Sequence, residues 1–157
     1  MKGLTLGLTI AAVVILVVGV SLAIFFNVFF KQMKTSGVER IQERFPTEQI
    51  VLSETTANYF GLESRGSLQI RGNGVLVLTQ DELWFSRLVK REDISIPTNT
   101  IQAVRLVDSH LGKRILGRQL IYVQFEGSDG ADSVAWLVAD PNRWQTEIAS
   151  LIENGQP

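Results

Sequence analysis

The chain has 157 residues, a net charge of −1 and no cysteine. Disulfides, thiolate metal sites and a cysteine nucleophile are therefore excluded. Nucleophilic and general-base catalysis usually also requires histidine or paired carboxylates in a cleft, and the chain has a single histidine, His110. We expect a protein that is not an enzyme, with no catalytic residue, no metal site and no cofactor.

The first segment is an uncharged run of 28 residues, Gly3 to Phe30, between Lys2 and Lys31. A helix needs about 20 apolar residues to cross the hydrocarbon core of a bilayer. The alternative is a secretory signal peptide, but its apolar part has only about 7–15 residues and is followed by small residues. The run therefore predicts a transmembrane helix over residues 3–30, with the lipid bilayer as its partner.

The orientation of this predicted span follows from its flanks, because basic residues near a span stay on the cytoplasmic side. Lys2 precedes the run, whereas Lys31, Lys34, Arg40 and Arg44 follow it. The expected localisation is the cell membrane, single-pass, with the N-terminus outside and the C-terminal domain cytoplasmic.

Small residues recur at four-residue spacing in the same run, at Gly3, Gly7 and Ala11. This spacing lets two helices approach closely and marks a candidate helix dimer face. The alternative is the ordinary abundance of Gly and Ala in apolar segments.

Residues 31–46 form a predicted connector. Val38, Ile41 and Phe45 fall on one helical face, and Pro46 ends the pattern. The segment is either a short amphipathic helix at a membrane surface or, as we favour, a plain connector between the first helix and the domain.

Beyond Pro46 the pattern becomes extended, with β-rich runs separated by turn residues. The expected strands are 49–59, 66–71, 75–79, 83–87, 93–96, 101–107, 120–126 and 133–139. Gly72-Asn73-Gly74 predicts a tight hairpin turn, because these residues tolerate positive φ.

The chain is expected to end in a helix. Asp140 is a helix N-cap followed by Pro141, and an apolar stripe follows at Trp144, Ile148, Leu151 and Ile152. Such a stripe has to be buried, and the open end of a curled sheet is the available place. Residues 47–157 are therefore predicted to be one domain.

Together these residues resemble the GRAM and bacterial pleckstrin-homology-like domains. The resemblance is carried by Gly74–Thr79, Leu83-Trp84-Phe85, Ile94–Pro97 and Asp140…Trp144…Ile148. It implies a mainly β fold, a strongly bent antiparallel sheet or partly open barrel capped by the C-terminal helix. Members of this superfamily often bind phosphoinositide headgroups or peptides, but the loop Leu62–Gly66 lacks the clustered basic residues of tight phosphoinositide binders.

Basic residues concentrate later in the chain. Between Arg87 and Arg118 there are seven basic and three acidic residues. This asymmetry favours contact with an anionic surface, and the alternative is a solvated or protein-contacting loop. The candidate contacts for anionic lipid are Arg87, Lys90, Arg91, Lys113, Arg114 and Arg118.

Successive residues of a strand point to opposite faces, so Trp84 lies on the face opposite Leu83 and Phe85. It is a candidate partner contact. Trp136 and Trp144 lie in apolar patterns typical of a core, so we expect no stacking platform for bases and no nucleic acid partner.

The sequence thus predicts a membrane-anchored, non-enzymatic binding or scaffolding module, which holds a PH-like domain at the cytoplasmic membrane face for recognition of a membrane or cytoplasmic protein. The alternatives are peripheral recognition of anionic lipid headgroups by the basic loops, or an accessory subunit of a membrane enzyme or transporter.

Overall fold

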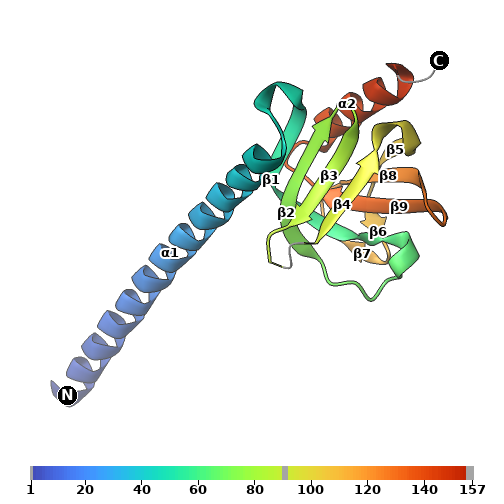
Figure 1. Cartoon of the computed structure of the whole chain (residues 1–157). Coiled ribbons are helices and arrows are strands. Elements are labelled where there is room, and N and C mark those ends of the chain that lie inside the picture. Colours follow the sequence, from blue (N-terminus) through green and yellow to red (C-terminus); the bar gives the residue numbers. More distant parts are fainter. Residues whose placement is uncertain (1, 90–91, 155–157) are drawn as a thin grey trace. The chain divides into compact units, whose positions relative to one another are not determined.

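The computed structural model describes residues 2–89 and 92–154, and it describes only the backbone of residues 2–9, 12, 30, 33 and 34. The chain divides into two compact units, residues 1–35 and 36–157. Figure 1 shows one long helix, a bent sheet and a second helix near the C-terminus.

Helix α1, Lys2–Arg44, forms the first unit up to Thr35, and its last turns, from Ser36, belong to the second unit. Crossing a bilayer requires about 20 apolar residues in one helix. Among the residues that the structure describes, no helix combines the required length and apolarity. The predicted transmembrane helix over 3–30 is therefore wrong, and so is the single-pass localisation with an outside N-terminus and a cytoplasmic domain.

The second unit is mainly β with a C-terminal helix, as predicted. In the described part of the chain, one antiparallel sheet has seven strands in the order β4-β3-β2-β1-β9-β8-β5, and β6 and β7 form a separate pair. The strands are β1 Ile50–Leu62, β2 Gly72–Thr79, β3 Glu82–Arg87, β4 Asp93–Pro97, β5 Ile101–Val107, β6 Ser109–His110, β7 Lys113–Arg114, β8 Leu120–Gly127 and β9 Gly130–Leu137. Short 3₁₀ turns are η1 Thr47–Gln49, η2 Glu63–Arg65 and η3 Thr98–Thr100.

Strand β1 bends the sheet. Its 13 residues pair with β2 along most of the strand and with β9 near its C-terminal end. Irregular pairing between Glu54 and Ala57, and again between Tyr59 and Gly61, accompanies this change of partner. Bulges of this kind increase local twist, so one strand serves both halves of the sheet.

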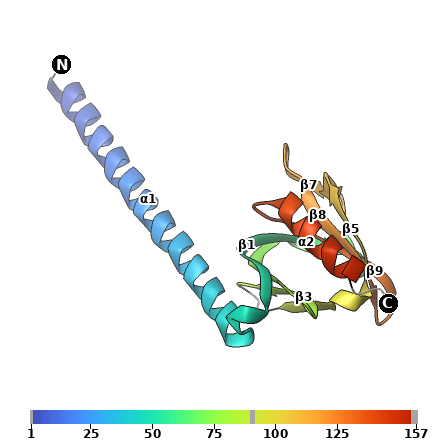
Figure 2. The same ribbon diagram turned by 90° about the horizontal axis from the view of Figure 1, so that it is seen from above.

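Helix α2, Pro141–Asn154, closes the core between these halves (Figure 2). The Asp140 carboxylate accepts a hydrogen bond from the backbone N–H of Arg143 at 3.1 Å, which confirms the predicted N-cap. Trp144 and Ile148 are fully buried in a core that also includes Phe85 and Trp136. The amphipathic stripe therefore predicted both the helix and its buried face.

The segment 66–71 was predicted as a strand, but it is a loop between η2 and β2. Gln69 Oε1 accepts hydrogen bonds from the backbone N–H of Leu62 at 3.1 Å and from the Tyr59 hydroxyl at 2.8 Å. Gln69 Nε2 donates to the carbonyl of Leu62 at 2.6 Å. A side chain thus satisfies the end of β1, where the prediction expected a neighbouring strand.

The predicted hairpin turn at Gly72-Asn73-Gly74 is also wrong, because these residues begin β2 and pair with β1. A Cβ added at Gly74 would lie 2.4 Å from the ring of Phe85 and 2.5 Å from the carbonyl oxygen of Ser86. Glycine is required here by the close approach of β3, and no turn is involved.

The end of α1 covers the outer face of β2 and β3. Ile41 and Phe45 are buried with Val75, Val77 and Trp84, whereas Val38 is 44% exposed. The segment 31–46 is therefore helical up to Arg44, and its last turns form part of the second hydrophobic cluster of the β unit.

Candidate functional site

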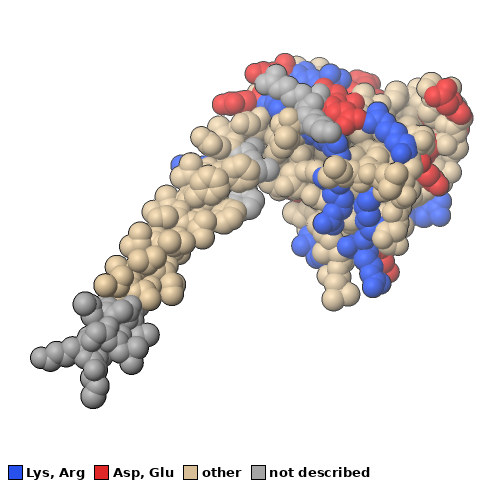
Figure 3. All heavy atoms as spheres, turned by 90° about the horizontal axis from the view of Figure 1, so that it is seen from below, with Lys and Arg blue, Asp and Glu red and all other residues tan. Residues whose placement is uncertain are grey.

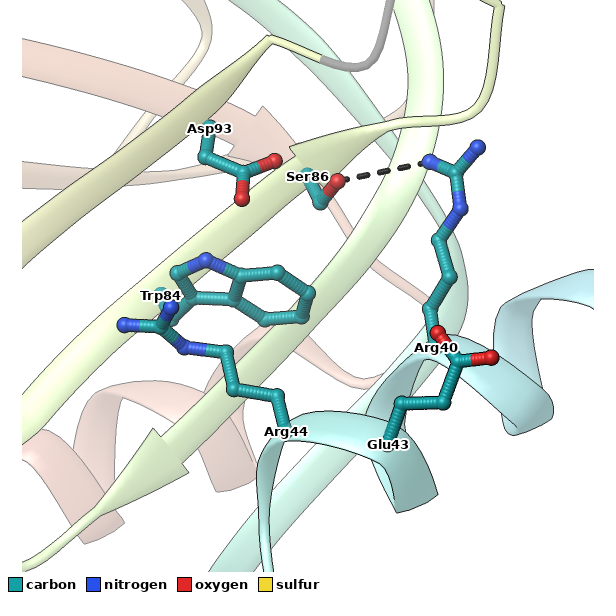
Figure 4. A pocket seen from close by; sticks show the side chains of 6 residues that line it. All are labelled: Arg40, Glu43, Arg44, Trp84, Ser86 and Asp93. Atoms are coloured by element: carbon teal, nitrogen blue, oxygen red, sulfur yellow. Dashed lines mark hydrogen bonds between the residues drawn. The ribbon is translucent and has the colours of Figure 1, made fainter.

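Trp84, the predicted partner contact, is only 3% exposed. The ring of Phe45 packs edge-on against it at 5.4 Å, and the guanidinium of Arg44 lies 5.1 Å from its ring centre. Trp84 lines a pocket of about 530 Å³ between the end of α1 and strands β3 and β4, and Figure 4 shows the side chains that surround it. Its own chain therefore covers the surface of this residue.

The arginines of this pocket are bound within the chain. Arg40 donates to the carbonyl oxygens of Arg87 and Leu88 at 2.6 and 3.1 Å, and to Ser86 Oγ at 3.3 Å. Arg44 pairs with Glu82 at 3.0 Å. These contacts attach α1 to the sheet and leave little free positive charge for an anionic ligand.

Arg87, a predicted lipid contact, holds loops together at the end of β3. Its guanidinium lies 4.8 Å from the ring centre of Tyr59, pairs with Glu92 at 3.3 Å and donates to the carbonyl of Ile70. Burial raises the pKa of the Tyr59 hydroxyl in this cluster. Arg87 therefore has a structural role.

Two of the candidate lipid contacts, Lys113 and Arg114, form strand β7 of the β6–β7 hairpin, which packs on β1. His110 is 7% exposed, and its Nε2 lies 3.0 Å from the carbonyl oxygen of Gly61. Lys113 donates to the carbonyl of Phe60 at 3.2 Å. The absence of a side chain at Gly61 leaves room for Leu111, since a Cβ there would lie 2.7 Å from Leu111 Cδ1.

The other predicted site residues are not brought together. Arg118 donates to the carbonyl of Val138 at 3.1 Å, and Arg114 is exposed. Lys90 and Arg91 lie outside the described residues. Of the candidate dimer face, Ala11 is exposed, whereas the surroundings of Gly3 and Gly7 are outside the described set.

Apolar residues at loop tips are a feature that the sequence analysis missed. Ile70 and Val89 are 78% and 92% exposed and line a hollow of about 240 Å³ with Arg71 and Arg87. Figure 3 shows Lys and Arg side chains gathered on the face of the β unit seen from below.

Strand β4 has one unpaired edge. It pairs only with β3, through a register in which Trp84 faces Ser95 and Phe85 faces Ile94. Hydrogen bonds from Arg87 N–H to the Glu92 carbonyl and from Thr98 N–H to the Asp81 carbonyl lie at the two ends of this ladder. Because hydrogen-bonded pairs alternate, Ile94 and Ile96 bond to β3, while the backbone N–H and C=O of Asp93 and Ser95 point to the free edge.

This free edge lines a groove of about 600 Å³ whose opposite wall is the end of the β8–β9 hairpin. Ile94, Ile96 and Phe125 line it from the core and are each at most 9% exposed. Four of its described lining residues are acidic: Asp93, Glu126, Asp129 and Asp132. Arg65, the one basic residue among the described lining residues, is paired with Glu92. The described residues thus form an acidic groove along an open strand edge.

The carboxyl of Asp132, which lines this groove, is held in its ionised form by hydrogen bonds. Burial acts to raise its pKa, but hydrogen bonds from the Ser64 hydroxyl and N–H and from the Ser133 N–H outweigh burial and lower the pKa below its usual value. The carboxylate is therefore charged at neutral pH.

Sequence reasoning missed the groove because its walls come from segments about 30 residues apart along the chain. The available signal was the short run Asp93–Pro97, in which a proline closes a five-residue strand. Proline in a short strand is typical of a sheet edge.

Comparisons with known proteins show the class of fold but no family. No family model matches the chain, and no curated protein matches it. A chain in the structure of the 8S snRNP assembly intermediate is similar, with a TM-score of 0.55 and 14% identity over 71% of this chain and 88% of that chain. The C-terminal domain of an unknown protein from Leishmania infantum gives a TM-score of 0.47 and 13% identity over 66% and 84% of the two chains.

At 14% identity the first likeness shows a shared fold and nothing more. The chain is therefore a mainly β domain with a C-terminal helix, preceded by a long helix whose end packs on the sheet. The resemblance to GRAM and pleckstrin-homology-like domains is not tested by these comparisons and stays a prediction.

Proposed function

We propose that this protein is a non-enzymatic binding module that recognises a partner protein by strand addition at the free edge of β4. The observation that carries the proposal is the outward direction of the backbone groups of Asp93 and Ser95, which line a groove of about 600 Å³. An extended peptide binds such an edge with its main chain, and pockets for alternate side chains provide specificity.

The distribution of reactive groups supports a binding role over a catalytic one. His110 is buried against a backbone carbonyl, outside the lining of the groove. Within the described residues, no group of histidine and acidic side chains has the arrangement needed to hold a metal ion. The groove offers backbone donors and acceptors, apolar surface and carboxylates, which suit recognition of a peptide.

The test uses two substitutions at one position. Ser95→Pro removes the N–H that faces the groove, while the ladder to β3 keeps its hydrogen bonds because they belong to Ile94 and Ile96. Ser95→Ala removes only the hydroxyl, which donates to Glu82, and keeps the backbone N–H.

Affinity capture with the full chain, quantified by mass spectrometry, should give a protein that binds the wild type and Ser95→Ala but not Ser95→Pro. Circular dichroism should show both variants folded. Equal capture by all three forms would exclude the β4 edge as the binding site.

A second candidate function is contact with anionic lipid headgroups, favoured by the exposed Ile70 and Val89 beside Arg71. Exposed apolar side chains can insert between the lipid chains of a bilayer, while neighbouring basic residues contact the anionic headgroups. Residues 36–157 should then co-sediment with vesicles containing phosphatidylserine more than with neutral vesicles, and Ile70→Ser with Val89→Ser should weaken this binding. Equal binding to neutral and phosphatidylserine-containing vesicles, at low and at high salt, would exclude this function.

A further inference from the structure

We infer that the segment recognised at the β4 edge is extended and basic, with Lys or Arg alternating with apolar residues. The inference rests on the proposed function and specifies the chemistry of the partner. It follows from the charges of the groove and from the geometry of an added strand.

The charge of the groove favours a cationic occupant. Asp93, Glu126 and Asp129 are exposed. Of these three, Glu126 accepts a hydrogen bond from Gln102 at 2.9 Å. No described cation forms an ion pair with these three carboxylates. Among the described lining residues the one basic side chain, Arg65, is paired with Glu92, so a segment carrying Lys or Arg is complementary to the described surface.

The pleat of an added strand fixes which of its side chains meet which surface. Residues opposite Ile94 and Ile96 would share the inner face, where Leu62 and Phe125 also line the groove. Residues opposite Asp93 and Ser95 would share the outer face. Apolar side chains are therefore expected at one set of alternate positions and basic side chains at the other.

Asp93 connects this groove to the pocket around Trp84, because it lines both. Figure 4 shows its carboxylate on the outer face, on the same side as the indole of Trp84. Glu43 adds a carboxylate to that pocket, where Arg40 and Arg44 are bound to β3 and the loop after it. A basic side chain opposite Asp93 would thus lie next to the Asp93 carboxylate on the outer face.

The length of the recognised segment follows from β4, which has five residues. At about 3.4 Å per residue, a strand paired along it spans about 17 Å. The core of the binding segment is therefore about five residues long.

The test is selection from a random seven-residue peptide library on the full chain, kept monodisperse with a non-ionic detergent. The wild type should enrich peptides in which Lys or Arg alternates with Val, Ile or Leu. A labelled representative should bind about fivefold more weakly to a variant carrying Asp93→Asn and Asp129→Asn at low salt, because each lost charge pair contributes modestly at an exposed site. A matched variant carrying Glu48→Gln and Glu153→Gln, whose positions lie outside the lining of the groove, should bind as the wild type does.

The outcomes separate this inference from the proposed function. Enriched neutral or acidic peptides whose binding is lost in Ser95→Pro would overturn the basic segment and keep strand addition. Enriched peptides that bind Ser95→Pro unchanged would overturn both. A failure to enrich any peptide would overturn the inference of a basic segment. A dimer of the full chain that dissociates in the Ser95→Pro variant would also overturn it, since a second copy of the chain would then occupy the β4 edge.

Discussion

At the scale of the residue, His110 links the β6–β7 hairpin to the main sheet. Its ring packs edge-on against Tyr122 at 5.7 Å between centres, and Nε2 contacts the Gly61 carbonyl. Burial lowers the pKa of His110 below its ordinary value, although the carbonyl of Gly61 opposes this shift. The neutral ring is therefore the form that the folded state prefers.

This preference predicts a pH-dependent stability. The unfolded chain binds a proton at His110 with a pKa of about 6.5, whereas the folded chain binds it only at lower pH. The free energy of unfolding should therefore be highest above about pH 6.5 and decrease as the pH falls through that value towards the lowered pKa. Urea unfolding of the wild type at pH 7.5 and 5.5, followed by tryptophan fluorescence, should show the decrease.

His110→Gln removes the titrating group at this position and keeps a polar side chain near Gly61. Its stability should change less than that of the wild type between the same two pH values. Equal pH dependence in both proteins would contradict the role assigned to His110.

At the scale of the element, strand β2 depends on glycine for its approach to β3. Gly74→Ala should lower the free energy of unfolding by about 1–3 kcal/mol, because the new methyl group overlaps the Phe85 ring and the Ser86 carbonyl. The same substitution at Gly72, on the same face of the strand, meets only the end of the Arg87 side chain at 3.3 Å. Gly72→Ala should therefore change stability little.

Denaturant unfolding of the two alanine variants compares these positions directly. A similar loss of stability in both variants would contradict the packing explanation for Gly74.

The elements also show which sequence signals were sufficient. The cap at Asp140 and the spacing of Trp144 and Ile148 predicted α2, because capping and amphipathic periodicity act within one or two turns of a helix. The same local reasoning misread residues 66–74, because glycine has two uses. It supplies positive φ in a turn, and it also permits close packing inside a sheet.

At the scale of the whole molecule, the structural boundary falls between Thr35 and Ser36, within helix α1. The last turns of this helix belong to the β unit through Ile41 and Phe45, which are each 6% exposed. Residues 36–157 should therefore fold as a stable unit without the preceding segment.

A shorter fragment, residues 47–157, should be less stable by about 3 kcal/mol or more, because it lacks two large apolar side chains that cover Val75, Val77 and Trp84. Its tryptophan emission should also shift to longer wavelength as Trp84 becomes exposed. Equal stability and equal emission in the two fragments would show that the end of α1 does not contribute to the folded β unit.

The sequence by itself determined the mainly β character of residues 47–157 and the capped C-terminal helix, because both depend on periodicities and capping that neighbouring residues define. Only the tertiary structure decided the burial of Trp84, the packing of the basic segment 109–114 and the groove along β4. Each of these depends on contacts between segments far apart in sequence: α1 with β3, the β6–β7 hairpin with β1, and β4 with the end of the β8–β9 hairpin. Local patterns specify which face of a strand is apolar, but they do not specify which distant segment covers that face or leaves an edge free.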